Sequence, residues 1–383
     1  MLLERLIKFL TSLRLTVVLL VLSIVLIFAG TFGEVHLGLY QAQTDYFRSF
    51  FVYWQPSGAH WKIPVFPGGY FLGMALLINL IAAHLSRFKF TRKKIGLWII
   101  HAGLILLILG QLATDLFAKE SQMHLREGQT KNYSQSDRMD ELAITDITDK
   151  KLETVVAIPQ SLLARESDIR NGHLPFIVRV KQFYANSVLS TNATPDFARV
   201  AADAGVGADS LWWKRVPRET DMNRRDTPSA LVQIVTPDGP VGIWLVSDWL
   251  EQPQTFTAND RTYQMQLRPE RFYLPFSLKL LKFTHTVYQG TDTPRSFSSQ
   301  MMLMDPGSGE HRQVLIYMNH PLRYDGRTFY QASYDTDNQG TILQVVKNPS
   351  WLTPYLACVI IATGLIIQFL SHLVPFLKKR RAA

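Results

Sequence analysis

Histidines within apolar segments are the residues of this sequence best suited to carry chemistry. In the stretch IGLWIIHAGLILLILG at 95–110, every residue except His101 is apolar or glycine. An ionisable side chain inside a membrane-spanning segment is costly and by default indicates a functional site. The competing interpretation is that a neutral His101 only packs and forms a hydrogen bond with a neighbouring helix.

Three glycines indicate which way His101 points. Gly96, Gly103 and Gly110 recur every seven residues and would form a smooth stripe for close helix packing. His101 lies about 200° around the helix from Gly103, because each residue turns the helix by about 100°. We therefore expect the imidazole to face away from the glycine seam, toward a ligand or a second protein.

His84 is a second candidate, three residues before Arg87. His101 lies roughly 9 Å along its helix from Ile95, so the two rings could reach similar depths on neighbouring helices. Two imidazoles that face each other across a gap are an arrangement typical of haem axial ligands. His84 is also near enough to the headgroups to be merely interfacial, and the sequence leaves both interpretations open.

The other histidines are weaker candidates. No pair among them has metal-ligand spacing, and the chain contains no G-x-S-x-G, P-loop or H-E-x-x-H motif. We interpret His36 and His60 as possible contacts of an exported ligand, His372 as interfacial, and His124, His173, His285, His311 and His320 as surface or turn residues.

Four segments are apolar and long enough to span a bilayer, which takes about 20 residues. They are Leu15–Phe32, Tyr70–Leu85, Ile95–Ala113 and Trp351–Leu377. The first is followed by GTFGE and not by a small-residue cleavage site, so we expect a retained anchor and not a cleaved signal peptide.

The net charge of +9 reflects membrane topology and not nucleic-acid binding, because basic residues cluster beside the spans. All these clusters fall on one side of a four-span protein, as the positive-inside rule requires. Both termini are then cytoplasmic, and 33–69 and 116–350 lie outside. The clusters comprise Arg5, Lys8 and Arg14; Arg87, Lys89, Arg92, Lys93 and Lys94; and Lys378, Lys379, Arg380 and Arg381.

The region 116–350 alternates polar and apolar residues in short runs between turn signals. Runs such as ALVQIV, RTYQMQL, FSLKLLKF and RTFYQASY predict an antiparallel β-sandwich or barrel. We expect a helical excursion over 187–229, where Ala, Asp, Gly and Arg cluster. The only cysteine, Cys358, lies in the last span, so the outer domain has no disulfide, no C-x-x-C motif and no C-x-x-C-H motif.

The first outer loop, LGLYQAQTDYFRSFFVYW at 37–54, is rich in aromatic residues. Aromatic side chains at this density favour the headgroup boundary, so we expect an interfacial helix. The alternative is a surface for a flat aromatic ligand or a partner helix. The chain thus divides into a three-span region 1–115 with outer loop 33–69, an outer β domain 116–350, and a fourth span with a basic tail at 351–383.

Three stretches resemble the ResB family, also called CcsB. They are LPFSLKLLKFTHTVYQGTDTPRSFSS at 274–299, NHPLRYDGRTFYQASYD at 319–335, and GLWIIHAGLILLILG at 96–110. The resemblance implies work beside a second membrane protein, CcsA (ResC), which carries a tryptophan-rich WGxxWxWD motif. Neither LWWKR at 211–215 nor SDWL at 247–250 matches that motif, so the chain resembles the B half alone.

In that family the role implied is the export of haem b across the bacterial inner membrane. The haem is then delivered, with CcsA, to the C-x-x-C-H motif of apocytochrome c, with thioredoxin-like proteins reducing the cysteines. The chain would be a non-autonomous subunit of a cytochrome c haem lyase or synthase complex, in which His101 ligates haem iron opposite a residue of CcsA. The alternatives are a scaffold or apocytochrome chaperone that stabilises CcsA without binding haem, and a subunit with an outer sensor domain.

Overall fold

The computed structural model describes residues 2–56, 61–87, 91, 94–149, 152–208, 211–221, 224–290 and 294–382. The chain forms two compact units. The first, here called the membrane unit, comprises Met1–Lys119, Thr220–Met222 and Lys347–Ala383. The second, here called the β unit, comprises Glu120–Glu219 and Asn223–Val346.

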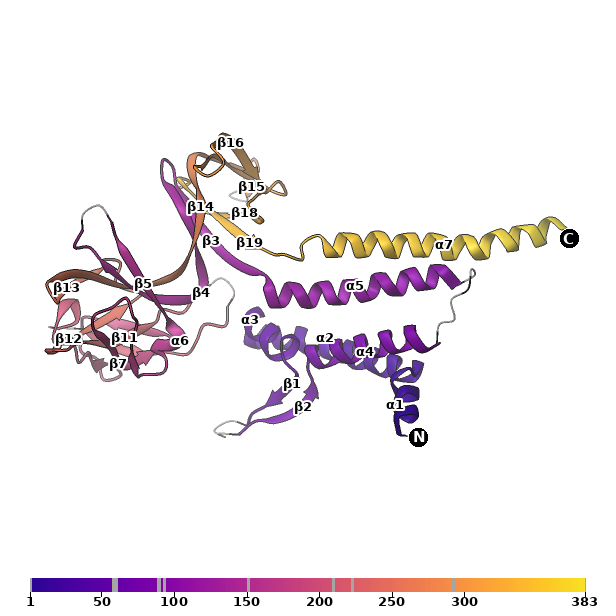
Figure 1. Cartoon of the computed structure of the whole chain (residues 1–383), viewed down its shortest axis with the longest axis horizontal. Coiled ribbons are helices and arrows are strands. Elements are labelled where there is room, and N and C mark those ends of the chain that lie inside the picture. Colours follow the sequence, from indigo (N-terminus) through magenta and orange to yellow (C-terminus); the bar gives the residue numbers. More distant parts are fainter. Residues whose placement is uncertain are drawn as a thin grey trace. The chain divides into compact units, whose positions relative to one another are not determined.

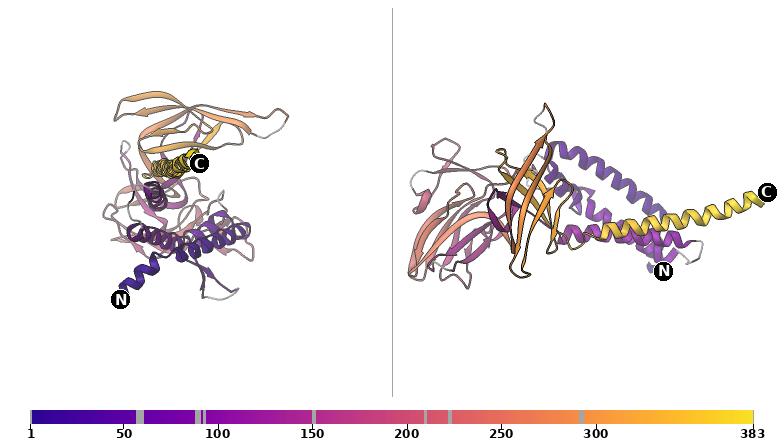
Figure 2. Two further views of the ribbon diagram at one scale, coloured as in Figure 1. Left: turned by 90° about the vertical axis from the view of Figure 1, so that its right-hand side faces the viewer. Right: turned by 90° about the horizontal axis from the view of Figure 1, so that it is seen from above.

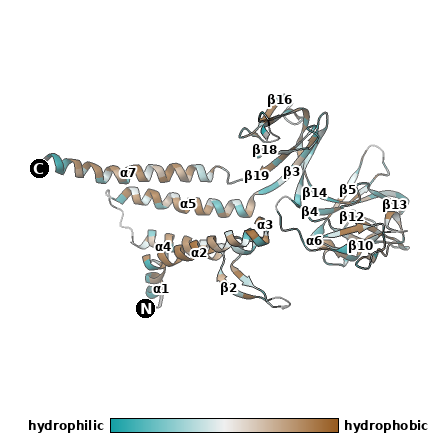
Figure 3. Ribbon diagram, turned by 180° about the vertical axis from the view of Figure 1, so that it is seen from behind, coloured by the Kyte–Doolittle hydropathy of each residue, from teal (hydrophilic) through white to brown (hydrophobic). Residues whose placement is uncertain are grey.

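Long apolar helices dominate the membrane unit (Figures 1 and 3). They are α2 (Leu13–Leu37), α4 (Gly69–Arg87), α5 (Ile95–Phe117) and α7 (Thr353–Ala382), preceded by a short α1 (Leu2–Leu10). These four are, within the described part of the chain, the helices long and apolar enough to cross a membrane. They overlap the four expected segments. Helix is the expected structure there, because lipid offers no hydrogen bonds to the backbone and a helix satisfies its own. The predicted four-span fold is confirmed.

The glycine stripe of α5 packs against α7, and the two helices run side by side in both views (Figures 1 and 2). A Cβ added at Gly96 would lie 2.7 Å from Cβ of Gln368. A Cβ added at Gly103 would lie 2.6 Å from Cγ1 of Ile361. Only glycine therefore allows this separation of the two helices.

A buried amide joins α4 to the start of the chain. The Thr16 hydroxyl donates to Oδ1 of Asn79 at 2.6 Å. The amide nitrogen of Asn79 donates to the Leu10 carbonyl, also at 2.6 Å. Such polar contacts hold helices together in lipid, where apolar packing alone discriminates little.

The outer loop is only partly helical. Residues Leu39–Ala42 form α3 and Gln43–Phe47 a single π-helical turn. Phe51–Trp54 (β1) then pairs antiparallel with Ile63–Pro67 (β2). The expectation of a helix through 54 is wrong for FVYW, because aromatic and β-branched residues also favour strands when a partner is available.

The β unit is antiparallel, which confirms the predicted all-β fold (Figure 1). Its largest sheet has ten strands in the order β16-β15-β14-β4-β3-β19-β18-β17, with β13 beside β14 and β5 beside β4. Smaller sheets have the orders β12-β11-β7-β6 and β8-β10-β9. The strands are β3 (Lys119–Arg126), β4 (Thr130–Asp146), β5 (Thr154–Pro159), β6 (Asp168–Ile169), β7 (Ile177–Tyr184), β8 (Ser187–Ser190), β9 (Ala198–Arg199), β10 (Trp212–Arg215), β11 (Ser229–Thr236), β12 (Gly239–Ser247), β13 (Gln254–Ala258), β14 (Arg261–Val287), β15 (Pro294–Asp305), β16 (Glu310–Tyr317), β17 (Leu322–Tyr324), β18 (Arg327–Tyr334) and β19 (Gly340–Lys347).

One strand serves two hydrophobic cores. RTYQMQL and FSLKLLKF, which read as separate runs, form the single strand β14 (Figure 1). Its first part contributes Met265 to a core shared with β7 and β11. Its second part contributes Phe276 to a core shared with β15 and β18. The pairing of β14 with β4 shifts register between Pro269 and Arg271, and again between Tyr273 and Leu278.

The helical excursion expected over 187–229 is wrong. The described residues of this stretch hold β8, β9, β10 and one 3-10 turn at Gly205–Gly207. Trp213 on β10 is 2% exposed and pairs with Leu189 on β8. Burial of this indole fixes the segment as strand, while its small polar residues form turns.

Candidate functional site

The two candidate histidines meet between α4 and α5. The ring centroids of His84 and His101 are 5.9 Å apart with an interplanar angle of 78°. His84 is 8% exposed, and His101 is half-buried. The fold thus brings together two imidazoles that are separate in sequence.

Trp98 completes this cluster. Its indole centroid lies 3.9 Å from that of His84, in an edge contact. Trp98 and His101 are three residues apart and so share one side of α5. The sequence does not predict this contact, because it depends on which residue of a second helix lies beside Trp98.

The imidazole pair forms an edge contact. The centroid distance of 5.9 Å and the interplanar angle of 78° lie in the range of ordinary contacts between ring side chains. The contact brings two nitrogen-bearing rings from neighbouring helices close together.

His101 and the glycine stripe use different sides of α5. Gly103 packs on α7, whereas His101 contacts His84 of α4. The expected orientation of the imidazole, away from the glycine seam, is thus observed. The group opposite His101 is a histidine of this same chain.

A heptad series extends from each histidine. On α4, Tyr70, Leu77 and His84 are seven residues apart, and on α5, His101, Ile108 and Asp115 repeat that spacing. Residues seven apart lie on nearly the same side of a helix. The helices are antiparallel, because His84 contacts His101 while Tyr70 donates a hydrogen bond to Asp115.

A cavity of about 960 Å³ lies between α4 and α5, along the same heptad series. Its wall is mostly apolar, with residues from the outer loop and both helices. They include Leu39, Phe47, Gly73, Leu77, Ile108 and Leu112.

The cavity has one polar end. Arg48 Nε lies 3.1 Å from Asp115 Oδ1, and Tyr70 donates to the other carboxylate oxygen. Gly69 makes this possible, because a Cβ there would collide with the Phe47 carbonyl oxygen. This group was not predicted from the sequence, where its signal is the heptad spacing of Tyr70 from His84 and of Asp115 from His101.

The other histidines lie elsewhere. His36 is exposed at the end of α2, His372 is exposed on α7 beside Gln368, and His60 lies outside the described residues. In the β unit, His124 pairs with Asp335 at 2.9 Å. His320 stacks on Tyr317, and His285 contacts Tyr334. No group of three metal-ligating side chains occurs in the ranges that the structure describes.

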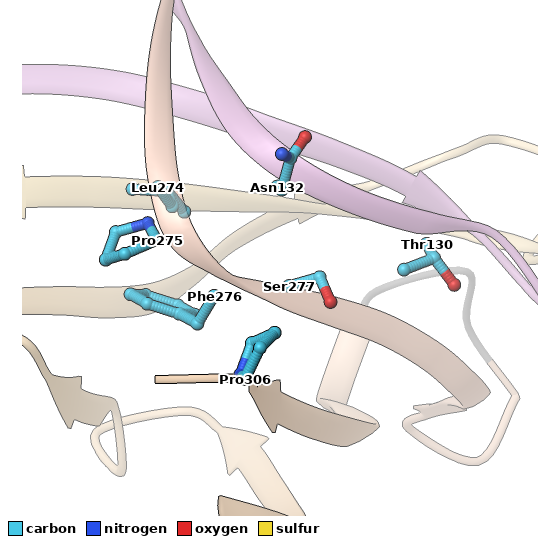
Figure 4. A pocket seen from close by; sticks show the side chains of 7 residues that line it. All are labelled: Thr130, Asn132, Leu274, Pro275, Phe276, Ser277 and Pro306. Carbon is cyan, nitrogen blue, oxygen red and sulfur yellow. The ribbon is translucent and has the colours of Figure 1, made fainter. Parts of the chain in front are cut away.

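A small pocket of about 240 Å³ lies in the β unit (Figure 4). It opens where β14 shifts register, since residues 274–277 face only Asn132 of β4. None of its seven lining residues is titratable: Thr130, Asn132, Leu274, Pro275, Phe276, Ser277 and Pro306. Its side chains therefore offer no titratable acid or base.

Asp140 is a strongly perturbed group of the β unit. Burial raises its pKa to about 6, although Arg225 opposes the shift. Asp140 is 3% exposed and pairs with Arg225, which also lies 3.6 Å from Asp248. All of these side chains have partners within the fold, which is typical of a structural ion-pair network.

Fold and site together define a class of protein: a membrane protein with four candidate spans, an all-β domain and paired imidazoles between two spans. The model of the ResB-like family matches residues 247–342 of this chain, which include the two β-unit stretches singled out in the sequence. The resemblance to the ResB family that the sequence shows is thereby confirmed for these residues.

Two further proteins are similar over most of the chain. Protein NrfI of Wolinella succinogenes is 25% identical over 301 residues, or 77% of this chain. The chain spans only 29% of the length of NrfI. Among solved structures, Cytochrome c Heme Lyase CcmF aligns with 78% of this chain and 30% of its own, at 10% identity. Its TM-score of 0.22 does not establish a common fold.

Proposed function

We propose that this protein handles haem during cytochrome c biogenesis, as a subunit of a cytochrome c synthase in the membrane. The observation that carries the proposal is the meeting of His84 and His101 between two candidate spans, with Trp98 beside them. Titratable side chains are costly there, and a pair of them usually serves a function. The ResB family match and the similarity to NrfI support it.

Haem is the substrate in this proposal, and neutral imidazole is one of its ordinary axial donors. His101 would hold the iron. The opposite ligand is either His84 or a histidine of a CcsA-type partner. Trp98 would cover the edge of the site, as aromatic side chains do in ligand pockets that have few polar groups.

The proposal also covers the membrane in which the protein acts, its orientation there and its partner proteins. The protein would act in the bacterial inner membrane, with both termini cytoplasmic and the β unit periplasmic. It would pass haem, with CcsA, to apocytochrome c, whose cysteines thioredoxin-like proteins keep reduced. The basic clusters beside the spans support this orientation, although Lys89, Arg92 and Lys93 lie outside the described residues.

The test is replacement of each histidine by alanine in the chain co-expressed with its partner. His101→Ala should insert and assemble, since alanine is a good helix former. The purified complex should lose haem or show a five-coordinate spectrum, and added imidazole should restore part of the haem content. Holocytochrome c should not accumulate.

His84→Ala and His372→Ala make the test specific. If His84 is the opposite ligand, its variant should match His101→Ala; if the partner supplies that ligand, its variant should retain most of the haem. His372 is a histidine on α7, exposed and beside Gln368, so His372→Ala should leave the spectrum unchanged. An unchanged spectrum and normal cytochrome maturation with His101→Ala would return the chain to the scaffold interpretation.

A further inference from the structure

We propose that the cavity between α4 and α5 binds one zwitterionic phospholipid whose headgroup carries a primary ammonium. The cavity measures about 960 Å³, is mostly apolar, and ends at the Arg48–Asp115 ion pair. This inference does not depend on haem binding at His101.

The depth of the cavity is that of one lipid leaflet. On α4 its lining runs from Gly69 to Leu77, and on α5 from Leu107 to Leu116. At a rise of 1.5 Å per residue these stretches span roughly 12–14 Å. Half of a hydrocarbon core of about 30 Å is roughly 15 Å. An acyl chain lying against Leu77 and Ile108 would therefore fill the cavity along its length.

The polar end of the cavity is where headgroups are found. Tyr70 is the second residue of α4, and Asp115 lies two residues before the end of α5. Arg48 comes from the loop between the first two spans and is half exposed. A polar cluster at the ends of two spans lies at the level of the membrane–water interface.

The charges of this cluster select the headgroup. Arg48 donates to a phosphate in a forked geometry, and the Asp115 carboxylate accepts from an ammonium. Gln43 and Gln111 add neutral donors to the lining, while Tyr70 donates to Asp115. One positive and one negative side chain match a headgroup that has one charge of each sign.

Other occupants fit these charges less well. An anionic lipid would leave Asp115 facing a second negative group. A porphyrin has two propionates, whereas the described lining has Arg48 as its one cation beside the carboxylate of Asp115. Two anionic groups would therefore find one cation and one like charge. The phospholipid is therefore the occupant that we test.

Gly73 offers a direct way to block the cavity. It lines the cavity, and a Cβ added there meets no atom within 4 Å. Gly73→Phe should therefore fill the space without steric conflict and leave α4 helical. Ala102→Phe, on an exposed side of α5, is the matched control.

The experiment uses the full-length chain, reconstituted into vesicles of equal parts phosphatidylethanolamine, phosphatidylcholine and phosphatidylglycerol. After extraction in mild detergent, mass spectrometry counts the lipids retained per protein. We expect about one retained phosphatidylethanolamine in the unmodified chain and in Ala102→Phe. Gly73→Phe should retain none.

Arg48→Gln tests the headgroup contact while keeping an amide donor. It should lower phosphatidylethanolamine retention about tenfold, as expected for loss of one charge-assisted hydrogen bond. Arg126→Gln, which removes the arginine of the exposed pair with Asp337, should change nothing. Circular dichroism checks folding, and Gly73→Leu is a smaller filler if Gly73→Phe is unfolded.

Three results would overturn the proposal. The first is equal retention of the three lipids, and the second is retention unaffected by Gly73→Phe or Gly73→Leu. The third is a porphyrin absorption that Gly73→Phe removes and His101→Ala leaves intact, since the cavity would then hold haem. Loss of haem in His101→Ala alone bears on the proposed function and not on the lipid.

Discussion

At the scale of single residues, the histidines show how environment decides role. His124, His285 and His320 have partners in the β unit that tie them to its strands and turns. His84 and His101 lie in apolar helices, where a charged imidazolium is costly to bury. Neutral imidazole is the form that binds metal.

Asp140 gives a prediction at the same scale. Its folded pKa of about 6 exceeds the unfolded value of about 3.9, so the folded state binds the proton more tightly. Lowering the pH from 7.5 to 5 should therefore stabilise the β unit, by about 1 kcal/mol from this group. Asp140→Asn should reduce that gain, as measured by urea unfolding of the full-length chain followed by circular dichroism.

Between pH 7.5 and 5, the stability change reports on buried carboxyls with raised pKa values and not on exposed ones. Burial also raises the pKa of Asp137 and Asp248, so some pH dependence should remain in Asp140→Asn. The hydrogen bond with Arg179 lowers the pKa of Asp168, whose contribution is lost only below the window. Asp168→Asn should thus show the same change in unfolding free energy between pH 7.5 and 5 as the unmodified chain. A smaller change in Asp168→Asn would contradict the assignment of the pH dependence to buried carboxyls.

The sequence predicts individual residues of the site better than their assembly. His101 stands out because one titratable side chain interrupts an apolar run. The contact of His84 with Trp98 and the hydrogen bond from Tyr70 to Asp115 join different helices, and a single sequence does not show which sides of two helices meet. The heptad spacing on each helix is visible in the sequence. It shows that the two series face each other only once the antiparallel pairing of α4 and α5 is known.

At the scale of elements, the α5–α7 seam rests on three glycines without side chains. Gly103→Leu would drive its side chain into Ile361, whose Cγ1 would lie 2.6 Å from an added Cβ. Overpacking of this kind costs about 1–3 kcal/mol. We expect a lower thermal unfolding midpoint in detergent for Gly103→Leu, and little change for Ala102→Leu on the exposed side of α5.

A comparable loss of stability in Gly103→Leu and Ala102→Leu would contradict the claim that α5 and α7 pack closely through Gly103. The loss would then be a general effect of a larger side chain. An unchanged midpoint in Gly103→Leu would contradict that claim as well.

The elements themselves follow from two periodicities. Long apolar runs predict α2, α4, α5 and α7, and alternation predicts most strands of the large sheet. The two wrong helix predictions concern segments whose structure depends on a pairing strand. FVYW at 51–54 pairs with Ile63–Pro67, and WWKR at 212–215 pairs with Ser187–Ser190. Aromatic side chains favour a strand where a pairing partner is available, so the neighbouring segment determines which element forms.

At the scale of the whole molecule, the distribution of charge predicts orientation. Basic clusters before α2 and at the end of α7 favour the cytoplasmic side for both termini. Reporter fusions at Ala383 and in the turn at 235–240 should therefore give opposite signals. Equal signals from the two fusions would contradict the four-span topology.

Strand β14 contributes odd-numbered residues to one core of the β unit and begins its contribution to another with even-numbered residues. Its side chains in the first core are Tyr263, Met265 and Leu267, all odd, and those that begin the second are Leu274, Phe276 and Leu278, all even. The change of parity falls within 268–273, beside the register shifts. Successive strand residues alternate between faces, so losing a single residue there would turn one core's side chains outward. Gaining or losing two would preserve both cores, and length variation in this stretch should therefore come in pairs.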